Sequence, residues 1–527
     1  MSINGLTEER NAVNTPLSRR RLVAMGAAGA ALALALAQPA AADPAGQGLV
    51  FDVRRFGARG DGVTIDSDAV NRAIKAAARS GGTVYFPAGT YACYSIRLSS
   101  DIGLYLAENA TILAAKPANG RGYDPAEPGA GNAYQDYGHS HWHNSLIWGE
   151  GLANITIHGP GKIDGSGLVS GGSQESAALQ GNKAIALKLC RNVAIRDITI
   201  VNGGHFGILP TGVDNFRIDG LVIDTNRDGI NLDCCRNVRI ANTTVNSPND
   251  DAIVLKSSYA LGEARATENV TIDNCMVSGY DLGTLVNGTY RTAAYGRTGR
   301  IKCGTESNGG FKNIAISNVI FEYCRGLALE TVDGGLLEDV TISNLTMRNV
   351  QMPFFFRLGA RMRGPAGVAV GTLRRVSISD VIAYNADPRY PSTIAGIPGH
   401  NVQDVRISNV RHHLAGGLSP GDAVQDPPEL ENAYPEPTMF GTLPAYGFFI
   451  RHAAGVTMDN VEVRYGAVDT RPAVVLRDVS DADFHHGRAD KTPDVPTFVL
   501  DDVDAFAVTT SRPVADLHLD HADHREL

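Results

Sequence analysis

The stretch NRDGINLDCCRNVRIANTTVNSPNDDAIVLK, residues 226–256, contains both the repeat and the acidic residues around which the chain is organised. Asp228 lies in a glycine-bounded turn, and the adjacent pair Asp250 and Asp251 begins 22 residues later. A spacing of about 22 residues is one turn of a solenoid made of short strands. Neighbouring strands lie roughly 4.8 Å apart, so such a solenoid gathers the three carboxylates on one surface.

A repeat of the same length extends in both directions from this stretch. The pattern asparagine, aliphatic, any residue, aliphatic begins at Asn154, Asn192, Asn215, Asn237, Asn269 and Asn313, and shorter forms continue to residue 458. Apolar alternation, asparagine-rich turns and this period predict an all-β fold, a right-handed parallel β-helix. Asparagine tolerates left-handed turns and forms ladders between neighbouring coils, so we expect such ladders here.

Residues 1–42 are typical of a twin-arginine signal peptide. Ser18–Val23 reads SRRRLV, an apolar run of alanine and leucine follows, and Ala40–Ala42 offers a small-residue cleavage site. The apolar run is shorter than the roughly 20 residues of a membrane span. We therefore expect a periplasmic or secreted monomer without stable membrane association.

The remaining residues divide into three predicted regions. These are an N-terminal cap with the first coils over residues 43–150, the β-helix catalytic region over 151–475, and last coils or a tail over 476–527. An amphipathic helix is predicted over residues 69–79, after the capping cluster Asp66–Asp68, where it would cover the open end of the solenoid. The histidine-rich tail, residues 518–524, is expected to be disordered.

Charge and cysteine content narrow the possible functions. A net charge of −9 argues against nucleic acid as a partner. The seven cysteines include no Cys-x-x-Cys pair, so buried thiols with at most one disulfide are expected instead of zinc or redox chemistry. Clustered acids without such ligands suit hydrolysis, in which one carboxyl donates a proton and another activates water. No cofactor or metal is expected.

The acidic blocks resemble those of family-28 glycoside hydrolases, the polygalacturonase family, which has a pectin lyase-like β-helix. The resemblance covers residues 51–465, and its most specific parts are Asn226–Gly229 (NRDG), Asn249–Asp251 (NDD) with Lys256 and Ser257, residues 304–313 and residues 325–331. It implies a hydrolase of pectic poly- or oligosaccharide.

The resemblance also implies a role for each acid. Asp250 would be the general acid, and Asp228 and Asp251 the bases that polarise water in an inverting reaction. Inversion requires room for water, with carboxyl groups roughly 6.5–9.5 Å apart. Three clustered carboxylates repel one another, so one of them should hold a proton near neutral pH.

The chain departs from the family where a galacturonate carboxylate would bind. Thr298–Arg300 stands in place of Gly-His-Gly, and Ala328–Glu330 in place of Arg-Ile-Lys. A glutamate there would repel a uronate, so a neutral sugar such as rhamnose in rhamnogalacturonan fits better. Arg300 and Lys302 share a strand face and could replace the lost clamp, or could lie on a solvated face. The expected substrate contacts are Asn226, Lys256, Arg300, Lys302, Glu330 and His205.

Two further clusters of side chains and two insertions could also contribute to the site. His139, His141 and His143 alternate on a predicted strand, and substrate contact or packing at the cleft edge is preferred to metal binding because no Asp or Cys partner is near. Glu306 and Asp333, with Glu330, are reserve carboxylates. Insertions at residues 280–299 and 419–444 could close one end of the cleft, which would favour exo action.

Two alternatives to hydrolysis stay open. A β-helix polysaccharide lyase would use Ca²⁺ and an Arg or Lys base and would leave unsaturated products. A non-catalytic carbohydrate-binding β-helix has no reason to double the acid at Asp250 and Asp251.

Overall fold

The computed structural model describes residues 49–128, 134, 139–170, 178–292 and 297–527. The predicted signal peptide, residues 1–42, lies outside the described residues. Within those residues, none of the helices has the length and apolar character that a membrane crossing requires.

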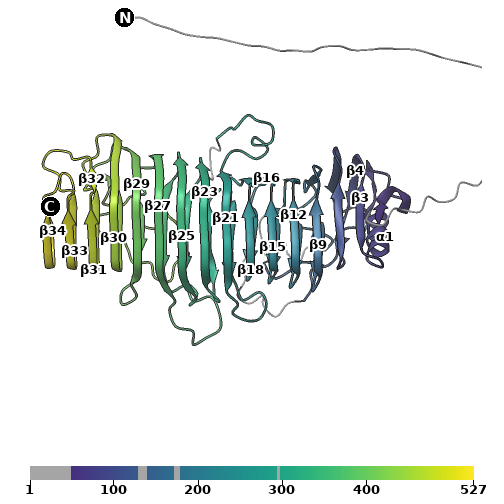
Figure 1. The fold of residues 1–527 in the computed structure, drawn as a ribbon, viewed down its shortest axis with the longest axis horizontal. Coiled ribbons are helices and arrows are strands. Elements are labelled where there is room, and N and C mark those ends of the chain that lie inside the picture. Colours follow the sequence, from purple (N-terminus) through teal and green to yellow (C-terminus); the bar gives the residue numbers. More distant parts are fainter. Residues whose placement is uncertain (1–48, 129–133, 135–138, 171–177, 293–296) are drawn as a thin grey trace, which may run out of the picture. The chain divides into compact units, whose positions relative to one another are not determined.

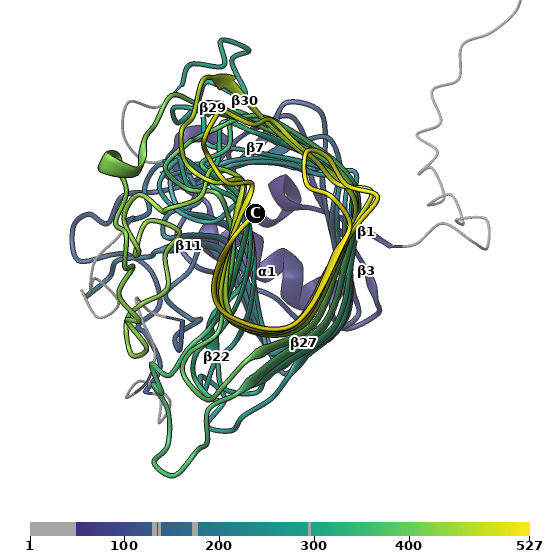
Figure 2. The same ribbon diagram turned by 90° about the vertical axis from the view of Figure 1, so that its left-hand side faces the viewer.

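Parallel strands stack into coils along the described chain, in three columns that follow one another around each coil (Figures 1 and 2). The first column contains β1 (Val50–Asp52), β3 (Gly82–Phe86), β6 (Ile102–Leu106), β9 (Ala153–His158), β12 (Arg191–Arg196), β15 (Asp214–Asp219) and β18 (Arg236–Ala241). The second, which we call the catalytic column, contains β5 (Ile96–Arg97), β8 (Ile147–Glu150), β11 (Lys183–Lys188), β14 (Phe206–Thr211), β17 (Asp228–Asp233), β20 (Ile253–Ser257), β22 (Ile301–Ser307), β24 (Gly326–Thr331), β26 (Met352–Leu358) and β28 (Ser392–Ala395). The predicted parallel β-helix is confirmed.

The third column begins as separate short strands and then joins the first. It contains β2 (Asp61–Ile65), β4 (Gly89–Cys93), β7 (Ala110–Ala114), β10 (Lys162–Asp164), β13 (Thr199–Val201), β16 (Val222–Asp224) and β19 (Thr244–Asn246). Beyond β19, longer strands span both columns: β21 (Thr267–Ser278), β23 (Phe311–Glu322), β25 (Leu336–Arg348), β27 (Thr372–Ala386), β29 (Val402–Gly416) and β30 (Phe448–Ala467). The last coils contain β31 (Val474–His485), β32 (Arg488–Ala489), β33 (Phe498–Thr509) and β34 (Leu517–Glu526).

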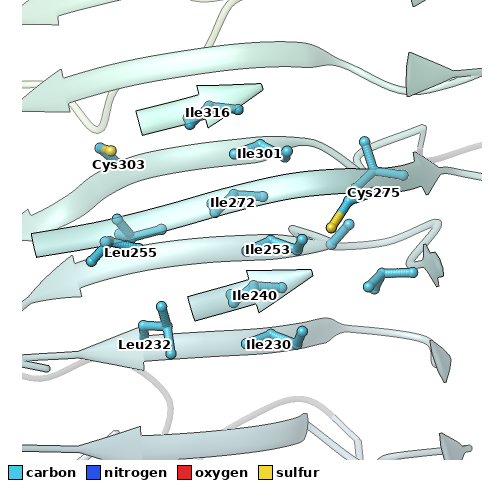
Figure 3. Packing of buried hydrophobic residues seen from close by; sticks show 14 of the residues in the cluster. Ile230, Leu232, Ile240, Ile253, Leu255, Ile272, Cys275, Ile301, Cys303 and Ile316 are labelled. Carbon is cyan, nitrogen blue, oxygen red and sulfur yellow. The ribbon is translucent and has the colours of Figure 1, made fainter. Parts of the chain in front are cut away.

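The interior of the tube is a set of aligned aliphatic columns. Figure 3 shows Ile230, Ile253 and Ile301 above one another, with Leu232, Leu255 and Cys303 in the next position along the same strands. All of these side chains are buried, and each aliphatic side chain contributes roughly 1.5–3 kcal/mol relative to exposure. A one-residue slip would turn each column outward, so the core fixes the register of the catalytic column.

Asparagine ladders run along the turns, as predicted. The amide of Asn215 donates to Asn192 at 3.0 Å, Asn237 to Asn215 at 3.2 Å, and Asn269 to Asn237 at 3.1 Å. These asparagines have φ values of 56° to 58°, the left-handed conformation that asparagine tolerates. The seven cysteines are all buried and unpaired, which confirms the expectation of buried thiols.

Two local predictions need correction. Helix α1 spans Ser67–Ala77 and not 69–79, because the Asp66 carbonyl already accepts the first helical hydrogen bond, from the Val70 amide at 2.9 Å; η1 (Val53–Phe56) precedes it. The prediction that the tail is disordered is wrong. Strand β34 pairs with β33 in antiparallel fashion and covers the last coil, and His521 and His524 bond Asp504 and Asp501 across the pair.

Candidate active site

The register of the catalytic column brings the three predicted acids together. Asp228 begins β17, Asp250 and Asp251 precede β20, and Ile230 pairs with Ile253. Oxygen atoms of the three carboxylates lie within 4.8 Å of one another. Gly229 makes this approach possible, since a Cβ there would meet the Ala252 carbonyl oxygen at 2.6 Å.

Asp228 is buried in surroundings that favour its neutral form. The Asn231 amide donates to Asp228 Oδ2 at 2.5 Å, while Oδ1 has no hydrogen-bond partner among the described residues. Burial raises the pKa of Asp228, and the charges of Asp250 and Asp251 raise it further, to well above its usual range. Its surroundings therefore favour the protonated form of Asp228 over the ionised form.

Asp251 is equally buried but lies among cations. Arg300 Nε donates to Asp251 Oδ1 at 2.6 Å, and Lys302 Nζ lies 3.8 Å from Oδ2. Burial alone would raise the pKa of Asp251, but the charges of Arg300, Lys302 and Lys256 outweigh it and lower the pKa to about 2. The pKa values of two adjoining carboxyls are thus shifted in opposite directions.

Asp250 is the most accessible of the three acids, with 24% of its side chain exposed, against 4% for Asp251. Arg227 forms an ion pair with it. Asp250 also accepts a hydrogen bond from the Asp251 amide at 3.1 Å. The predicted contact residue Asn226 lies beside it, half-buried, and accepts a hydrogen bond from Asn249 at 2.6 Å.

Arg300 and Lys302 share a face and are both buried, so the alternative that they lie on a solvated face is wrong. Their binding of a substrate carboxylate stays a prediction. Glu330, which is fully buried beneath them, lies 3.3 Å from Lys302 and 4.0 Å from Arg300. Burial raises the pKa of Glu330, against the lowering effect of Lys302 and Arg300, and one of its carboxylate oxygens has no hydrogen-bond partner among the described residues.

A second buried network lies beside the first. Lys256 forms an ion pair with Glu306, Arg361 Nε donates to Asp333 at 2.9 Å, and Arg361 also lies 3.4 Å from Glu306. Lys256 is thus directed at an internal acid and not at an open surface. The reserve carboxylates Glu306 and Asp333 are engaged by these cations.

The three histidines of residues 139–143 do not converge. Residues 141–146 form no strand, because the Glu127 carboxylate accepts hydrogen bonds from the Trp142 and His143 amides at 2.9 and 3.0 Å and curls the segment around it. His143 bonds Glu150 at 2.9 Å, and His141 bonds the Glu127 carbonyl at 2.8 Å. The strand-face prediction is wrong. Among the described residues, the ligand groups that could share a metal are the three aspartates alone.

Two histidines nevertheless adjoin the acids. His139 Nε2 accepts a hydrogen bond from Asn231 at 3.2 Å, so Asn231 links it to Asp228; burial lowers the His139 pKa to about 3. His205 is buried with its ring 4.5 Å from that of Phe206, which pairs with Asp228 on the next coil. Burial and then Arg227 lower the His205 pKa to about 2. Both imidazoles are neutral.

Residues 417–447, which we call the wall segment, connect β29 to β30 and cover the outer face of the catalytic column beyond the acids; they include η4 (Pro420–Asp422). Figure 2 shows connecting segments gathered outside the tube on the side of β11 and β22. Tyr434 lies over Lys302 at 5.4 Å, and Phe440 packs against Arg357 and Arg451 at 5.3 and 4.6 Å. The Glu436 carboxylate reaches Arg300 at 3.4 Å and pairs with Arg325.

The other predicted insertion is described over residues 280–292. The amide of Gly283 donates to Asp224 Oδ1 at 3.1 Å, and Asp281 lies 3.8 Å from Arg291. Asp224 ends β16, four residues before Asp228, so this segment borders the site from the side of the turn. Residues 293–296 lie outside the described part.

Several site residues were missed by sequence reasoning. Asn231 occupies an outward position on β17 between the inward Ile230 and Leu232, and strand alternation could have identified it. Arg227 adjoins Asp228 in the motif itself. Glu436 gave no signal, because 136 residues separate it from Arg300 and its surroundings are an irregular proline-rich segment.

Comparisons with known proteins agree with this geometry. Residues 50–330 match the family model described as "Rhamnogalacturonase A/epimerase, pectate lyase-like". A probable polygalacturonase of Vitis vinifera is 26% identical over 399 residues, which cover 68% of this chain and 73% of the relative. An exopolygalacturonase of Platanus acerifolia is 25% identical over 323 residues, covering 58% and 74%.

Solved structures share the fold. A family 28 exopolygalacturonase of Yersinia enterocolitica superposes with a TM-score of 0.62 at 19% identity, covering 83% of this chain and 78% of that one. A hyperthermoactive exopolygalacturonase of Thermotoga maritima gives 0.56 at 18% identity, covering 90% and 95%. The chain therefore belongs to the pectate lyase-like family of rhamnogalacturonase A and epimerases, and it is similar to polygalacturonases and exopolygalacturonases.

Proposed function

We propose that this protein is an exo-acting, inverting hydrolase of pectic polysaccharide that releases a neutral sugar, with rhamnose of rhamnogalacturonan as the first candidate. The observation that carries the proposal is the pairing of ionised Asp251 with protonated Asp228 in one cluster with the accessible Asp250. A cluster with opposed pKa shifts supplies both an acid and a base at one pH.

In the proposed reaction, the enzyme gives one proton to the substrate and takes one from water. Burial and the charge of Asp250 raise the Asp228 pKa, and we propose that Asp228 passes its proton to the adjoining Asp250. Asp250, the exposed member, gives that proton to the glycosidic oxygen as its bond to the anomeric carbon breaks. Asp251 takes a proton from the water that attacks the anomeric carbon from the opposite face. This assignment differs from the resemblance, in which Asp228 is a base.

Inversion is carried over from the family resemblance. The closest carboxylate oxygens lie within 4.8 Å, which is tighter than the separation of roughly 6.5–9.5 Å usual for inverting enzymes. Proton NMR of the first product, recorded before mutarotation, tests the proposal. Inverted anomeric configuration is expected; retention would contradict it, and a signal from an unsaturated ring would favour the lyase.

A neutral sugar is favoured because the cations near the acids are already balanced. Arg300 and Lys302 face Asp251, Glu330 and Glu436, while Lys256 and Arg361 face Glu306 and Asp333. A uronate would have to compete with these internal carboxylates for the same donors. A sugar without a carboxylate has no such cost.

Exo action is favoured by the position of the wall segment. Its residues Tyr434, Glu436 and Phe440 pack on the cations of β22, β24 and β26, the coils that follow the acids. A polymer lying along the catalytic column would collide with this segment just beyond Asp251. Only a chain end would then reach the acids.

The lyase alternative is weakened by the state of the candidate bases. A lyase base must be able to lose its proton, yet Lys256 and Lys302 are held in the charged form. Burial alone would lower the pKa of each, but Glu306 near Lys256 and Glu330 near Lys302 help to raise both pKa values above the usual range. A binding module would gain nothing from buried carboxylates that repel one another.

We propose export to the periplasm or medium, as residues 1–42 predict, and a monomeric protein acting there on pectic material. Replacing Arg19–Arg21 with lysine and fractionating the cells tests the export signal. Retention of the variant in the cytoplasm is expected. Unchanged export would contradict the twin-arginine assignment.

A further inference from the structure

The two guanidinium groups of Arg300 and Arg325 meet at one carboxylate, which the protein itself supplies. Glu436 Oε2 lies 3.4 Å from Arg300 Nη1 and within bonding distance of Arg325 Nη1, and Oε1 lies 3.5 Å from Arg300 Nη2. Burial would raise the pKa of Glu436, but Arg300 and Arg325 lower it below its usual range, so the carboxylate is ionised. Paired arginine donors around one carboxylate form a strong and geometrically specific anion site.

This anion site adjoins the catalytic acids. Arg300 binds Glu436 through its terminal nitrogens and Asp251 through Nε, so one guanidinium joins the two carboxylates. Arg325 precedes β24, on the side of the acids that the wall segment covers. A sugar ring bound between Asp251 and the wall segment would therefore direct one substituent toward the place that the Glu436 carboxylate occupies.

We propose that Glu436 is a built-in carboxylate ligand that fills the Arg300–Arg325 site and thereby selects an uncharged sugar over a uronate beside the catalytic acids. The choice of substrate class rests on the proposed function, whereas the occupied anion site rests on the contacts alone. Pectic chains carry uronates, and a uronate carboxylate matches the group that Glu436 presents in charge and shape. Removing Glu436 would leave two guanidiniums with an anion site open to such a ligand.

Glu436 is suited to this role because other residues anchor the wall segment. Tyr434 over Lys302 and Arg361, and Phe440 against Arg357 and Arg451, attach the segment on both sides of Glu436. Glu436 is also 29% exposed, whereas Glu330 beneath the same cations is fully buried. Substituting Glu436 should therefore open the anion site without releasing the segment.

Glu429 provides a matched control within the same segment. Its carboxylate lies 3.3 Å from Arg451 and 3.1 Å from His452, and 39% of its side chain is exposed. Like Glu436 it is a glutamate paired with arginine, but its partners belong to β30, which follows β28 at the far end of the catalytic column from the acids. Loss of either glutamate removes a carboxylate that pairs with two basic side chains, while only loss of Glu436 vacates the Arg300–Arg325 site.

The test measures binding of D-galacturonate, with D-galactose as the neutral probe, to the full-length wild type, E436A, E436Q, E429A and E429Q by calorimetry. We expect galacturonate affinity to rise at least about tenfold in E436A, to weaken with added salt, and to stay at the wild-type value in both Glu429 variants. Galactose affinity should not change. E436Q, which keeps the shape and loses the charge, should show a smaller gain of the same sign.

Several outcomes would overturn the proposal. They are equal galacturonate binding by wild type and a folded E436A, an equal gain in the Glu429 variants, or a gain for galactose as large as that for galacturonate. If E436A does not fold, a folded E436Q that shows no gain in galacturonate affinity would also overturn the proposal. Calorimetry measures binding without turnover, so the anion site and the proposed function are tested separately. A gain in galacturonate affinity in E436A, together with a wild type that hydrolyses nothing, would uphold the anion site and refute the proposed function.

Discussion

Asp228 and Asp251 have the same side chain and lie on adjacent coils, yet their pKa values shift in opposite directions. Burial on its own raises the pKa of both carboxyls. The difference comes from their neighbours: Asp228 faces two other carboxylates, whereas Asp251 faces Arg300 and Lys302. Position on the catalytic column therefore decides the direction in which the pKa of each acid is shifted.

At the residue scale, the first prediction concerns the accessible acid. Replacing Asp250 with asparagine removes the proposed proton donor while keeping the shape, so kcat should fall by roughly 10²- to 10⁴-fold. Steady-state kinetics on a rhamnogalacturonan oligosaccharide measures the effect. The control is Asp339→Asn, an exposed aspartate on β25, outside the catalytic column, where it pairs with Arg375 of β27; this variant should keep wild-type kcat. Equal activity of D250N and wild type would contradict the assignment.

The second prediction follows from the opposed pKa shifts. An aspartate with a raised folded pKa contributes stability below its unfolded value near 3.8 and loses that contribution as the pH rises through the folded value. Asparagine stays neutral, so D228N should gain thermal stability over wild type, and the gain should grow from pH 4 upward while activity is lost. Melting temperature measured against pH checks this.

Asp251 provides the control of opposite sign. Its folded pKa is lowered to about 2, so its stabilising contribution is complete above 3.8 and disappears as the pH falls toward 2. D251N should therefore be less stable than wild type at neutral pH and approach it in acid. Parallel pH profiles of D228N and D251N would contradict the opposed charge states.

At the scale of elements, the asparagine ladder links the turns of successive coils. Asn237 has a φ of 56°, accepts from Asn269 and donates to Asn215. Asn237→Ala should lower the free energy of unfolding by about 1–3 kcal/mol, from lost hydrogen bonds and from the left-handed conformation that alanine disfavours. Asn237→Gly should cost less because glycine adopts this φ freely. Urea unfolding of both variants measures the difference, and an equal loss would mean that backbone conformation contributes nothing.

The sequence predicted those elements whose cause is local. Asparagine at the left-handed turns and alternation in the strands identified the β-helix, and the 22-residue spacing brought Asp228 beside Asp250 and Asp251. The site beyond these acids depends on contacts between distant segments. Glu436 reaches Arg300 across 136 residues, and Glu330 reaches Lys302 from the next coil, so sequence reasoning misread Arg300 and Lys302 as an open clamp.

The histidine segment shows the same limit. Alternating imidazoles suggested a strand, but the Glu127 carboxylate accepts hydrogen bonds from the Trp142 and His143 amides. These contacts span 15 and 16 residues, and the periodicity of the sequence does not reveal them. The prediction for the tail was wrong for a related reason. Charge and histidine content suggested disorder, whereas pairing with β33 supplies backbone partners and two Asp–His contacts.

At the scale of the whole molecule, a rigid β-helix holds the acids and an irregular wall segment limits access to them. The aliphatic columns fix the register of the acids, and aromatic side chains on cations fix the wall segment. In the proposed function, catalytic chemistry and substrate choice are set by different parts of the chain. The acids lie within the repeat, whereas the wall segment does not. The positions of the acids were therefore easier to predict from the sequence than the kind of sugar that the site binds.

The most direct test of the central claim is product analysis by the purified enzyme on rhamnogalacturonan and polygalacturonate side by side, with D250N as the inactive control. The account predicts release of single neutral sugars from chain ends of rhamnogalacturonan, little galacturonate from polygalacturonate, and neither product from D250N. Rapid release of galacturonate from polygalacturonate, or internal cleavage into long fragments, would contradict the neutral-sugar, exo-acting site that the wall segment and its carboxylates define.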